Sequence, residues 1–225
     1  MAHNRGALTP AVEDYVKAVY TLETDGPGAT TTSLAERLGV QPGSVTGMVR
    51  KLVALGLTQH EPYRGVRLTA AGRRVALEVI RHHRLLELYL VESLGMSWDE
   101  VHDEAEILEH VLSDELEGLI AAKLGNPTID PHGDPIPSPE LTLERDNSRR
   151  LYDLEPGRSG TFVRVSDADP EMLRFLAERG IVPGTKLLVV ERQPFDGPVT
   201  VQLSGNREVL GAVLARAMRI REDDR

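Results

Sequence analysis

The sequence predicts an α+β protein, mainly α with small β parts, that combines a winged helix-turn-helix, a helical core and a small β-barrel. Two short apolar-periodic segments joined by a tight turn lie near the N-terminus. Two long helical patterns fill the middle, and alternating apolar runs separated by Gly, Pro and Asn fill the last third. With 225 residues, the chain is long enough for two or three such domains.

The N-terminal segments follow the order of a winged helix-turn-helix. Helices are expected over residues 10–23, 31–40 and 45–56, with a turn at 41–44 between the last two. The residues that follow, LTQHEPYRGVRLT, predict a hairpin with its tip at Tyr63-Arg64-Gly65. In this order the second short helix enters the DNA major groove and the hairpin is a wing. An ordinary helical hairpin beside a β-ribbon is the alternative.

The rest of the chain predicts a helical core and a β-rich end. Long helices are expected over residues 69–95 and 98–125, whose apolar stripes suit a core that also dimerises. Five prolines lie between residues 126 and 150, which predicts a linker or strap. Strands are expected at 162–167, 186–192 and 199–203, and a closing helix at 210–218. The predicted domains are therefore residues 1–75, 76–140 and 155–225, with a linker at 141–154.

Charge and composition narrow the classes of function. The net charge is −9, but residues 1–75 carry nine Lys/Arg against six Asp/Glu, which permits a DNA-binding face there. The chain has no cysteine, which excludes disulfides and thiolate metal ligands. It has no apolar segment like that of a signal peptide and no run of the ~18 apolar residues that a membrane span needs. We therefore expect a cytoplasmic protein without a membrane partner.

The segment HDEAEILEH, residues 102–110, is the most informative local pattern. On a helix, His102, Glu106, Glu109 and His110 share an arc of about 100°. One predicted helix earlier, a second His/Glu pair stands four residues apart, at residues 83 and 87. Charged residues at helical spacing are usually a solvated face. Histidines at both ends of a carboxylate pair, with a second such pair nearby, favour a metal site.

Enzyme motifs are missing from the sequence. It contains neither H-E-x-x-H nor H-x-x-E-H, no Glu-x-x-His pair of the di-iron kind, and no G-x-S-x-G, P-loop or dinucleotide motif. We therefore expect a protein that is not an enzyme and has no organic small-molecule substrate. A metal-storage or metallo-hydrolase bundle is the alternative from another class.

Taken together, these motifs resemble the iron- and manganese-dependent repressors of the diphtheria-toxin-repressor family. The similarity spans nearly the whole chain, and its segments are EDYVKAVYTLE, GSVTGMVRKL, YRGVRLT, RHHRLLELYL, VHDEAEILEHVLSDELE and DPHGDPIP. The resemblance implies a winged-helix domain, a dimerisation domain and a C-terminal SH3-like barrel of the kind found in ferrous iron transport accessory proteins. It also implies a homodimer that binds double-stranded operator DNA when loaded with metal.

The resemblance further implies two metal sites. The primary site would use Asp14, Glu106, Glu109 and His110. The ancillary site would use His83, Glu87 and His102, completed from the third domain by Asp169 and Glu171. For Asp169, the alternative is the N-cap of a helix that begins at Pro170.

The ligand types bear on the choice of metal. Iron-responsive members of the family have methionine and cysteine where this chain has Asp14 and Glu106. Replacing soft donors by carboxylates favours Mn²⁺, with Fe²⁺ as the alternative, and Zn²⁺ or Cd²⁺ can substitute in vitro. Lys17 stands where some manganese-responsive members have a second carboxylate, which leaves open whether the primary site holds one ion or two. Without metal, the carboxylates of this site are expected to repel one another.

For DNA contacts, the expected residues lie around the second short helix and on the wing. They are Gln41, Pro42, Ser44, Thr46 and Arg50, with Tyr63 and Arg64. The alternative for Arg50 is a solvated helix charge. Within regulators, an iron-dependent repressor of the same architecture and a metal-independent winged-helix regulator remain alternatives.

Overall fold

The structure is a computed structural model that describes residues 8–25, 28–61, 65–143, 146–167, 169–203 and 205–223. The chain divides into two compact units. Unit 1 comprises residues 1–83, 107–114 and 137–142, and unit 2 comprises residues 84–106, 115–136 and 143–225. Within the described residues, no helix is long and apolar enough to cross a membrane.

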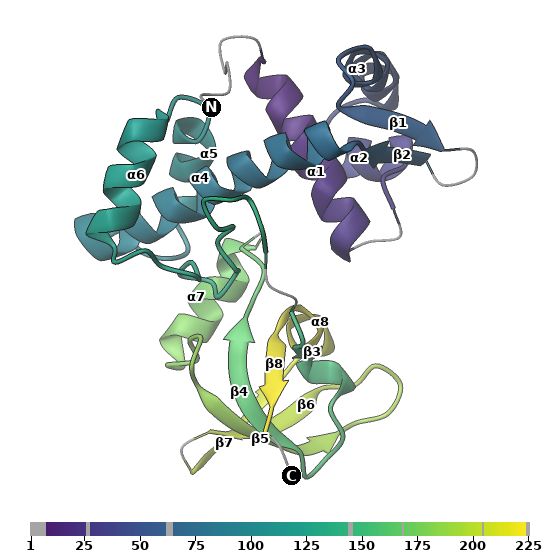
Figure 1. Ribbon diagram of the computed structural model, residues 1–225. Coiled ribbons are helices and arrows are strands. Elements are labelled where there is room, and N and C mark those ends of the chain that lie inside the picture. Colours follow the sequence, from purple (N-terminus) through teal and green to yellow (C-terminus); the bar gives the residue numbers. More distant parts are fainter. Residues whose placement is uncertain are drawn as a thin grey trace. The chain divides into compact units, whose positions relative to one another are not determined.

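Unit 1 contains the winged helix-turn-helix that the sequence predicts (Figure 1). Its elements are α1 (Pro10–Asp25), α2 (Thr31–Leu38), α3 (Pro42–Ala54), β1 (Thr58–Glu61) and β2 (Gly65–Leu68). The helix α2 begins at a capping box between Thr30 and Ser33 and ends at Gly39, which adopts the left-handed conformation. The helix α3 begins at Pro42, earlier than expected, because proline suits the first helical position. The two strands pair antiparallel, with Thr58 opposite Leu68.

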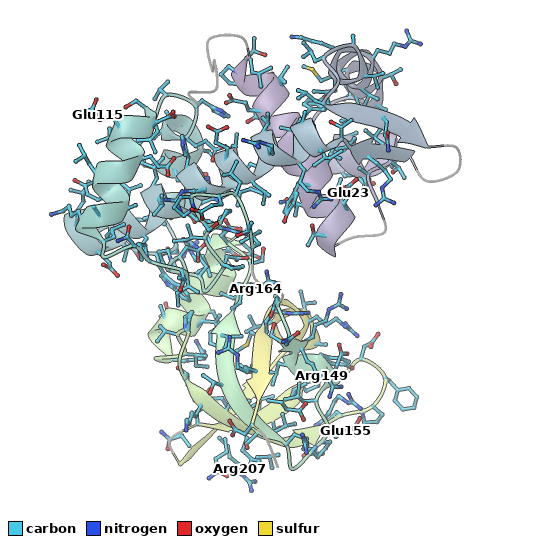
Figure 2. All side chains as sticks on the ribbon, viewed as in Figure 1. Glu23, Glu115, Arg149, Glu155, Arg164 and Arg207 are labelled. Carbon is cyan, nitrogen blue, oxygen red and sulfur yellow. The ribbon has the colours of Figure 1, made fainter. Side chains whose placement is uncertain are left out.

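The core of unit 1 forms on one face of α1. Val12, Val16 and Val19 are at most 1% exposed and pack in one cluster with fully buried residues of α2 and α3. At the end of α1, Glu23 (labelled in Figure 2) accepts a hydrogen bond from the Leu68 amide at 3.0 Å and pairs with Arg73, which follows the hairpin, at 3.1 Å. One packed body therefore contains α1, α2, α3 and the two wing strands.

The helix α4 (Ala70–Leu94) matches its prediction closely, but the next long helix does not. The sequence predicted one helix over residues 98–125, whereas the structure has α5 (Val101–Leu108) and α6 (Asp114–Lys123), with turns between them. Ser113 followed by two acidic residues is a typical helix start, since a hydroxyl can cap and carboxylates favour the first turn. The break places Glu109 and His110 just beyond the last residue of α5.

The C-terminal part of unit 2 is a curled antiparallel sheet with strand order β3-β8-β4-β5-β6-β7 (Figure 1). Its strands are β3 (Arg149–Arg150), β4 (Ser159–Arg164), β5 (Lys186–Arg192), β6 (Val199–Leu203), β7 (Asn206–Leu210) and β8 (Arg219–Glu222). The helices are the 3₁₀ turn η2 (Leu151–Asp153), α7 (Pro170–Glu178) and α8 (Ala212–Ala217). Fully buried Leu151 and Leu154, from the predicted linker, join its core. This domain confirms the predicted small barrel.

Candidate functional site

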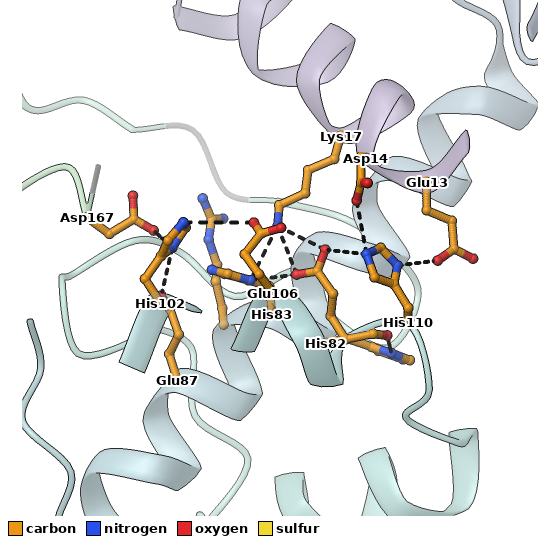
Figure 3. A network of polar contacts seen from close by, with 12 residues as sticks. Glu13, Asp14, Lys17, His82, His83, Glu87, His102, Glu106, His110 and Asp167 are labelled. Carbon is orange, nitrogen blue, oxygen red and sulfur yellow. Dashed lines mark hydrogen bonds and ion pairs between the residues drawn. The ribbon is translucent and has the colours of Figure 1, made fainter. Parts of the chain in front are cut away.

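The first cluster of ligand-type side chains lies in unit 1, between α1 and the turn after α5. His110 places its Nε2 2.9 Å from Oδ1 of Asp14 and its Nδ1 2.6 Å from Oε2 of Glu13 (Figure 3). Asp14, Glu109 and His110 each offer a ligand atom, and these three atoms lie within 4.8 Å of one another. The structure therefore brings together three of the four residues predicted for the primary site.

Glu109 is the most deeply buried carboxylate of this cluster, with 1% of its surface exposed. Its Oε2 lies 2.5 Å from Nδ1 of His83. The Lys17 ammonium donates to both oxygens of Glu109, at 3.0 and 2.8 Å. His83 was expected in the ancillary site, but within unit 1 its ring faces Glu109. Burial of a carboxylate costs free energy unless the charge is paired, and here an ammonium and an imidazole pair it.

Within unit 1, the carboxylates that were expected to repel one another without metal each lie beside a nitrogen of a neighbouring side chain. Asp14 and Glu13 face opposite nitrogens of one imidazole, and Glu109 faces an ammonium. Glu13 was not predicted as a member of this cluster, because only its neighbour Asp14 matches a ligand position of the family. These cationic and polar partners hold α1 against the turn after α5 by attraction.

The second cluster lies in unit 2 and centres on His102. Its Nδ1 lies 3.0 Å from Oδ2 of Asp167 and 3.6 Å from Oε1 of Glu87, a carboxylate on α4 with 1% exposure (Figure 3). Glu106 also belongs to this unit, and its Oε1 lies 3.9 Å from Nε2 of His102, one turn earlier on α5. Imidazole and carboxylate donors at these separations suit a divalent first-row metal.

The third-domain residue beside His102 differs from the two that were predicted. Asp169 is the N-cap of α7, and its side chain accepts from the backbone amides of Glu171 and Met172. Glu171 is exposed in the first turn of that helix. Capping holds the Asp169 carboxylate on its own helix. Asp167, two residues earlier, is the one whose carboxylate meets the imidazole.

Two further buried side chains, those of His132 and Asp130, lie near Glu87 within unit 2. Nε2 of His132 lies 2.7 Å from the Trp98 carbonyl oxygen, and because a carbonyl only accepts, this nitrogen carries the proton. The other nitrogen, Nδ1, lies 3.7 Å from Oε2 of Glu87. Burial lowers the pKa of His132, but Glu87, Asp130 and the Trp98 carbonyl outweigh it and raise that pKa to about 9. Burial, with Asp134 and Glu87 nearby, raises the pKa of Asp130 well above its usual value.

Five of the seven residues expected to contact DNA lie at the start of α3 or on its exposed face. Gln41 is its N-cap residue, and Pro42, Ser44, Thr46 and Arg50 are exposed, whereas Val45 and Leu52 face the core. Thr46 donates its hydroxyl hydrogen to the Pro42 carbonyl at 3.3 Å. Tyr63 and Arg64 lie outside the described residues. At the start of β2, Gly65 has a φ of +81°, and an added Cβ would lie 2.4 Å from the Ala29 oxygen. Only glycine fits where the wing meets the loop before α2.

Comparison with known protein families defines the class of protein. Three family models match, and together they span most of the chain: the iron dependent repressor N-terminal DNA binding domain at residues 7–66, its metal binding and dimerisation domain at 69–138, and the FeoA domain at 149–222. The chain therefore belongs to the iron-dependent-repressor, or diphtheria-toxin-repressor, family of metal-dependent transcription regulators. This confirms the resemblance seen in the sequence.

Individual relatives cover almost the full chain. The iron-dependent repressor IdeR of Mycobacterium tuberculosis is 33% identical, covering 95% of this chain and 97% of its own. The diphtheria toxin repressor of Corynebacterium efficiens is 32% identical, covering 96% and 97%. Among solved structures, a manganese-dependent transcriptional repressor in complex with manganese is 43% identical, with a TM-score of 0.89, covering 94% and 99%.

Proposed function

We propose that this protein is a Mn²⁺-activated transcription repressor that binds operator DNA as a homodimer and controls genes of metal uptake and homeostasis. The observation that carries the proposal is the contact of Asp14, on the first helix of the winged domain, with His110, beside Glu109. A metal bound at these residues would be held partly by the DNA-binding helices and partly by the turn after α5. Metal binding and DNA binding would therefore be coupled through α1.

The proposed primary ligands are Asp14, Glu106, Glu109 and His110. When bound, a divalent ion would supply the positive charge that links these carboxylates. The helix α1 carries Asp14 on its polar face, while its apolar face packs in the core shared with α2 and α3. Holding Asp14 therefore holds the recognition helix. Linkage of this kind typically has a coupling free energy of about 1–3 kcal/mol, and DNA then tightens metal binding by the same factor.

For the ancillary site, the proposed ligands are His83, Glu87, His102 and Asp167. Asp167 replaces Asp169 and Glu171 in this set, since its carboxylate lies 3.0 Å from the His102 ring. Oxygen donors outnumber nitrogen donors in the primary set, and there is no sulfur donor, which favours Mn²⁺ over softer choices. Fe²⁺ is the second candidate, and the similarity to a relative named an iron-dependent repressor supports it. Zn²⁺ and Cd²⁺ are proposed substitutes in vitro.

DNA contacts are proposed from the exposed face of α3 and from the wing. The residues are Gln41, Pro42, Ser44, Thr46, Arg50, Tyr63 and Arg64. We place the protein in the cytoplasm, without enzymatic activity, since the family consists of regulators that act on DNA.

The proposal is tested by gel shift with Mn²⁺ titrated against Asp14→Ala, Glu106→Ala and the exposed control Glu115→Ala. The probe is a duplex selected from a random pool with the Mn²⁺-loaded parent. The parent and the control should bind more tightly as Mn²⁺ rises. The two ligand variants should need at least roughly 10–100-fold more Mn²⁺, the cost of changing even the surroundings of a ligand. Two variants that respond like the parent would show the primary site to be misassigned.

Two further conditions separate the alternatives. Operator affinity that stays unchanged in chelator identifies a metal-independent winged-helix regulator. Absence of duplex binding at every salt concentration points to a storage or hydrolase bundle. Comparing DNA binding at matched free concentrations of Mn²⁺ and anaerobic Fe²⁺ identifies the metal that acts at the lower concentration.

A further inference from the structure

Lys17 places a cation inside the cluster proposed to bind the primary metal. Its ammonium lies 3.0 and 2.8 Å from the two oxygens of Glu109 and 3.3 Å from Nδ1 of His83. All three residues belong to unit 1. The Glu109 side chain is fully buried and that of Lys17 is 17% exposed. Figure 3 shows the Lys17 side chain extending away from α1.

The ammonium meets the part of Glu109 that a metal ion requires. A lysine ammonium is a compact point charge with three donors and no acceptor, so it cannot bind a metal while protonated. Both oxygens of Glu109 already accept from it, and one of them also faces His83. A divalent ion beside the same oxygens would lie within a few ångströms of the ammonium, where like charges repel strongly in partly buried surroundings.

The lysine also has a route out of the cluster. Its side chain is long and flexible, and 17% of its surface is exposed. The ammonium can therefore leave Glu109 while α1 stays in place through Asp14, Glu13 and the imidazole of His110. Departure of the lysine would expose the carboxylate lone pairs without undocking the helix.

We propose that Lys17 is a tethered cation that competes with the divalent metal for Glu109, so that loading the primary site exchanges the ammonium for the ion. This inference rests on the proposed function. It predicts that the protein binds Mn²⁺ more weakly than its carboxylates and imidazole alone would, and that Lys17 thereby sets the metal concentration at which the regulator responds.

The first test measures Mn²⁺ affinity of the full chain by calorimetry for the parent, Lys17→Met and the exposed control Lys123→Met. Methionine keeps an unbranched apolar stem and removes the charge. Losing a charge-assisted bond that competes with the ion should tighten Mn²⁺ binding by about tenfold or more. Lys123→Met should bind like the parent. A Lys17→Met protein that binds Mn²⁺ equally or more weakly overturns the proposal, because Lys17 would then support Glu109 as a ligand.

A second measurement uses the parent protein and so does not depend on whether the variant folds. Lysines are acetylated briefly with and without Mn²⁺, and the modified positions are quantified by mass spectrometry. Exchange predicts faster labelling of Lys17 with Mn²⁺ and no change at Lys123. Equal or slower labelling of Lys17 overturns the proposal. A parent that binds no Mn²⁺ overturns this proposal and the proposed function together, whereas Asp14-dependent binding with unchanged Lys17 labelling overturns this one alone.

Discussion

Replacing Glu109 by glutamine removes one charge from the most buried part of unit 1 while keeping the shape of the side chain. The Lys17 ammonium then loses the charge of this partner, although the amide oxygen can still accept one hydrogen bond. Breaking a fully buried pair costs about 3–5 kcal/mol. Lys17 is 17% exposed and can turn toward water, so the cost is nearer that of a lost charged hydrogen bond, about 2 kcal/mol.

The assay compares Glu109→Gln with the parent and with the exposed control Glu115→Gln in chelator. Hydrogen exchange of peptides from α1 reports local opening, and thermal unfolding followed by circular dichroism reports stability. For a chain of this size, about 2 kcal/mol corresponds to roughly 4–8 °C in melting temperature. Glu109→Gln should also lose the Mn²⁺-dependent gain in DNA binding. If its α1 exchange and melting match those of Glu115→Gln, the carboxylate is not holding α1 to the turn after α5.

Two further predictions concern unit 2. Asp167→Ala should weaken Mn²⁺ binding at the ancillary site. Asp169→Ala should leave Mn²⁺ binding unchanged and cost about 1 kcal/mol of stability, because α7 loses its N-cap. Equal metal affinities of the two variants in calorimetry would contradict the assignment of Asp167. Burial raises the pKa of the Asp146 carboxyl, but hydrogen bonds from Ser148 and the charge of Arg164 outweigh burial. The pKa therefore lies below its usual value. A carboxyl whose pKa is lowered by folding stabilises the folded protein at pH values above its unfolded-state pKa. This stabilisation is lost as the pH falls through the folded-state pKa. Asp146→Asn should therefore cost about 1 kcal/mol at pH 7 and progressively less as urea unfolding is repeated toward and below pH 4; a cost independent of pH would show that charge is not the cause.

Long apolar-periodic helices could be predicted from the sequence because their signal accumulates over many residues. The helices α1 and α4 begin and end within about two residues of expectation. The strands β3, β7 and β8 were missed, since they are short and largely polar on their exposed faces. Pairing with neighbours, rather than their own composition, makes them strands.

The candidate site was predictable where its residues share one helix. His102 and Glu106 are four residues apart, and the structure keeps them within 3.9 Å. The contacts of Lys17 with Glu109 and of Asp167 with His102 join residues more than sixty apart. No local pattern marks such pairs. The choice between Asp167 and Asp169 depended on which carboxylate the start of α7 would use as its cap.

The helix α1 presents chemically independent faces. Its buried valines belong to the core that positions the recognition helix, while Glu13, Asp14 and Lys17 meet the turn after α5. If the proposed function holds, a point mutation on the polar face would change the response to metal and leave the proposed DNA-binding surface intact. Natural selection can therefore adjust the metal sensitivity of such a regulator by single substitutions, without changes in the operators that it binds. In this arrangement, the metal concentration at which the regulator responds and the DNA sequence that it recognises can evolve separately.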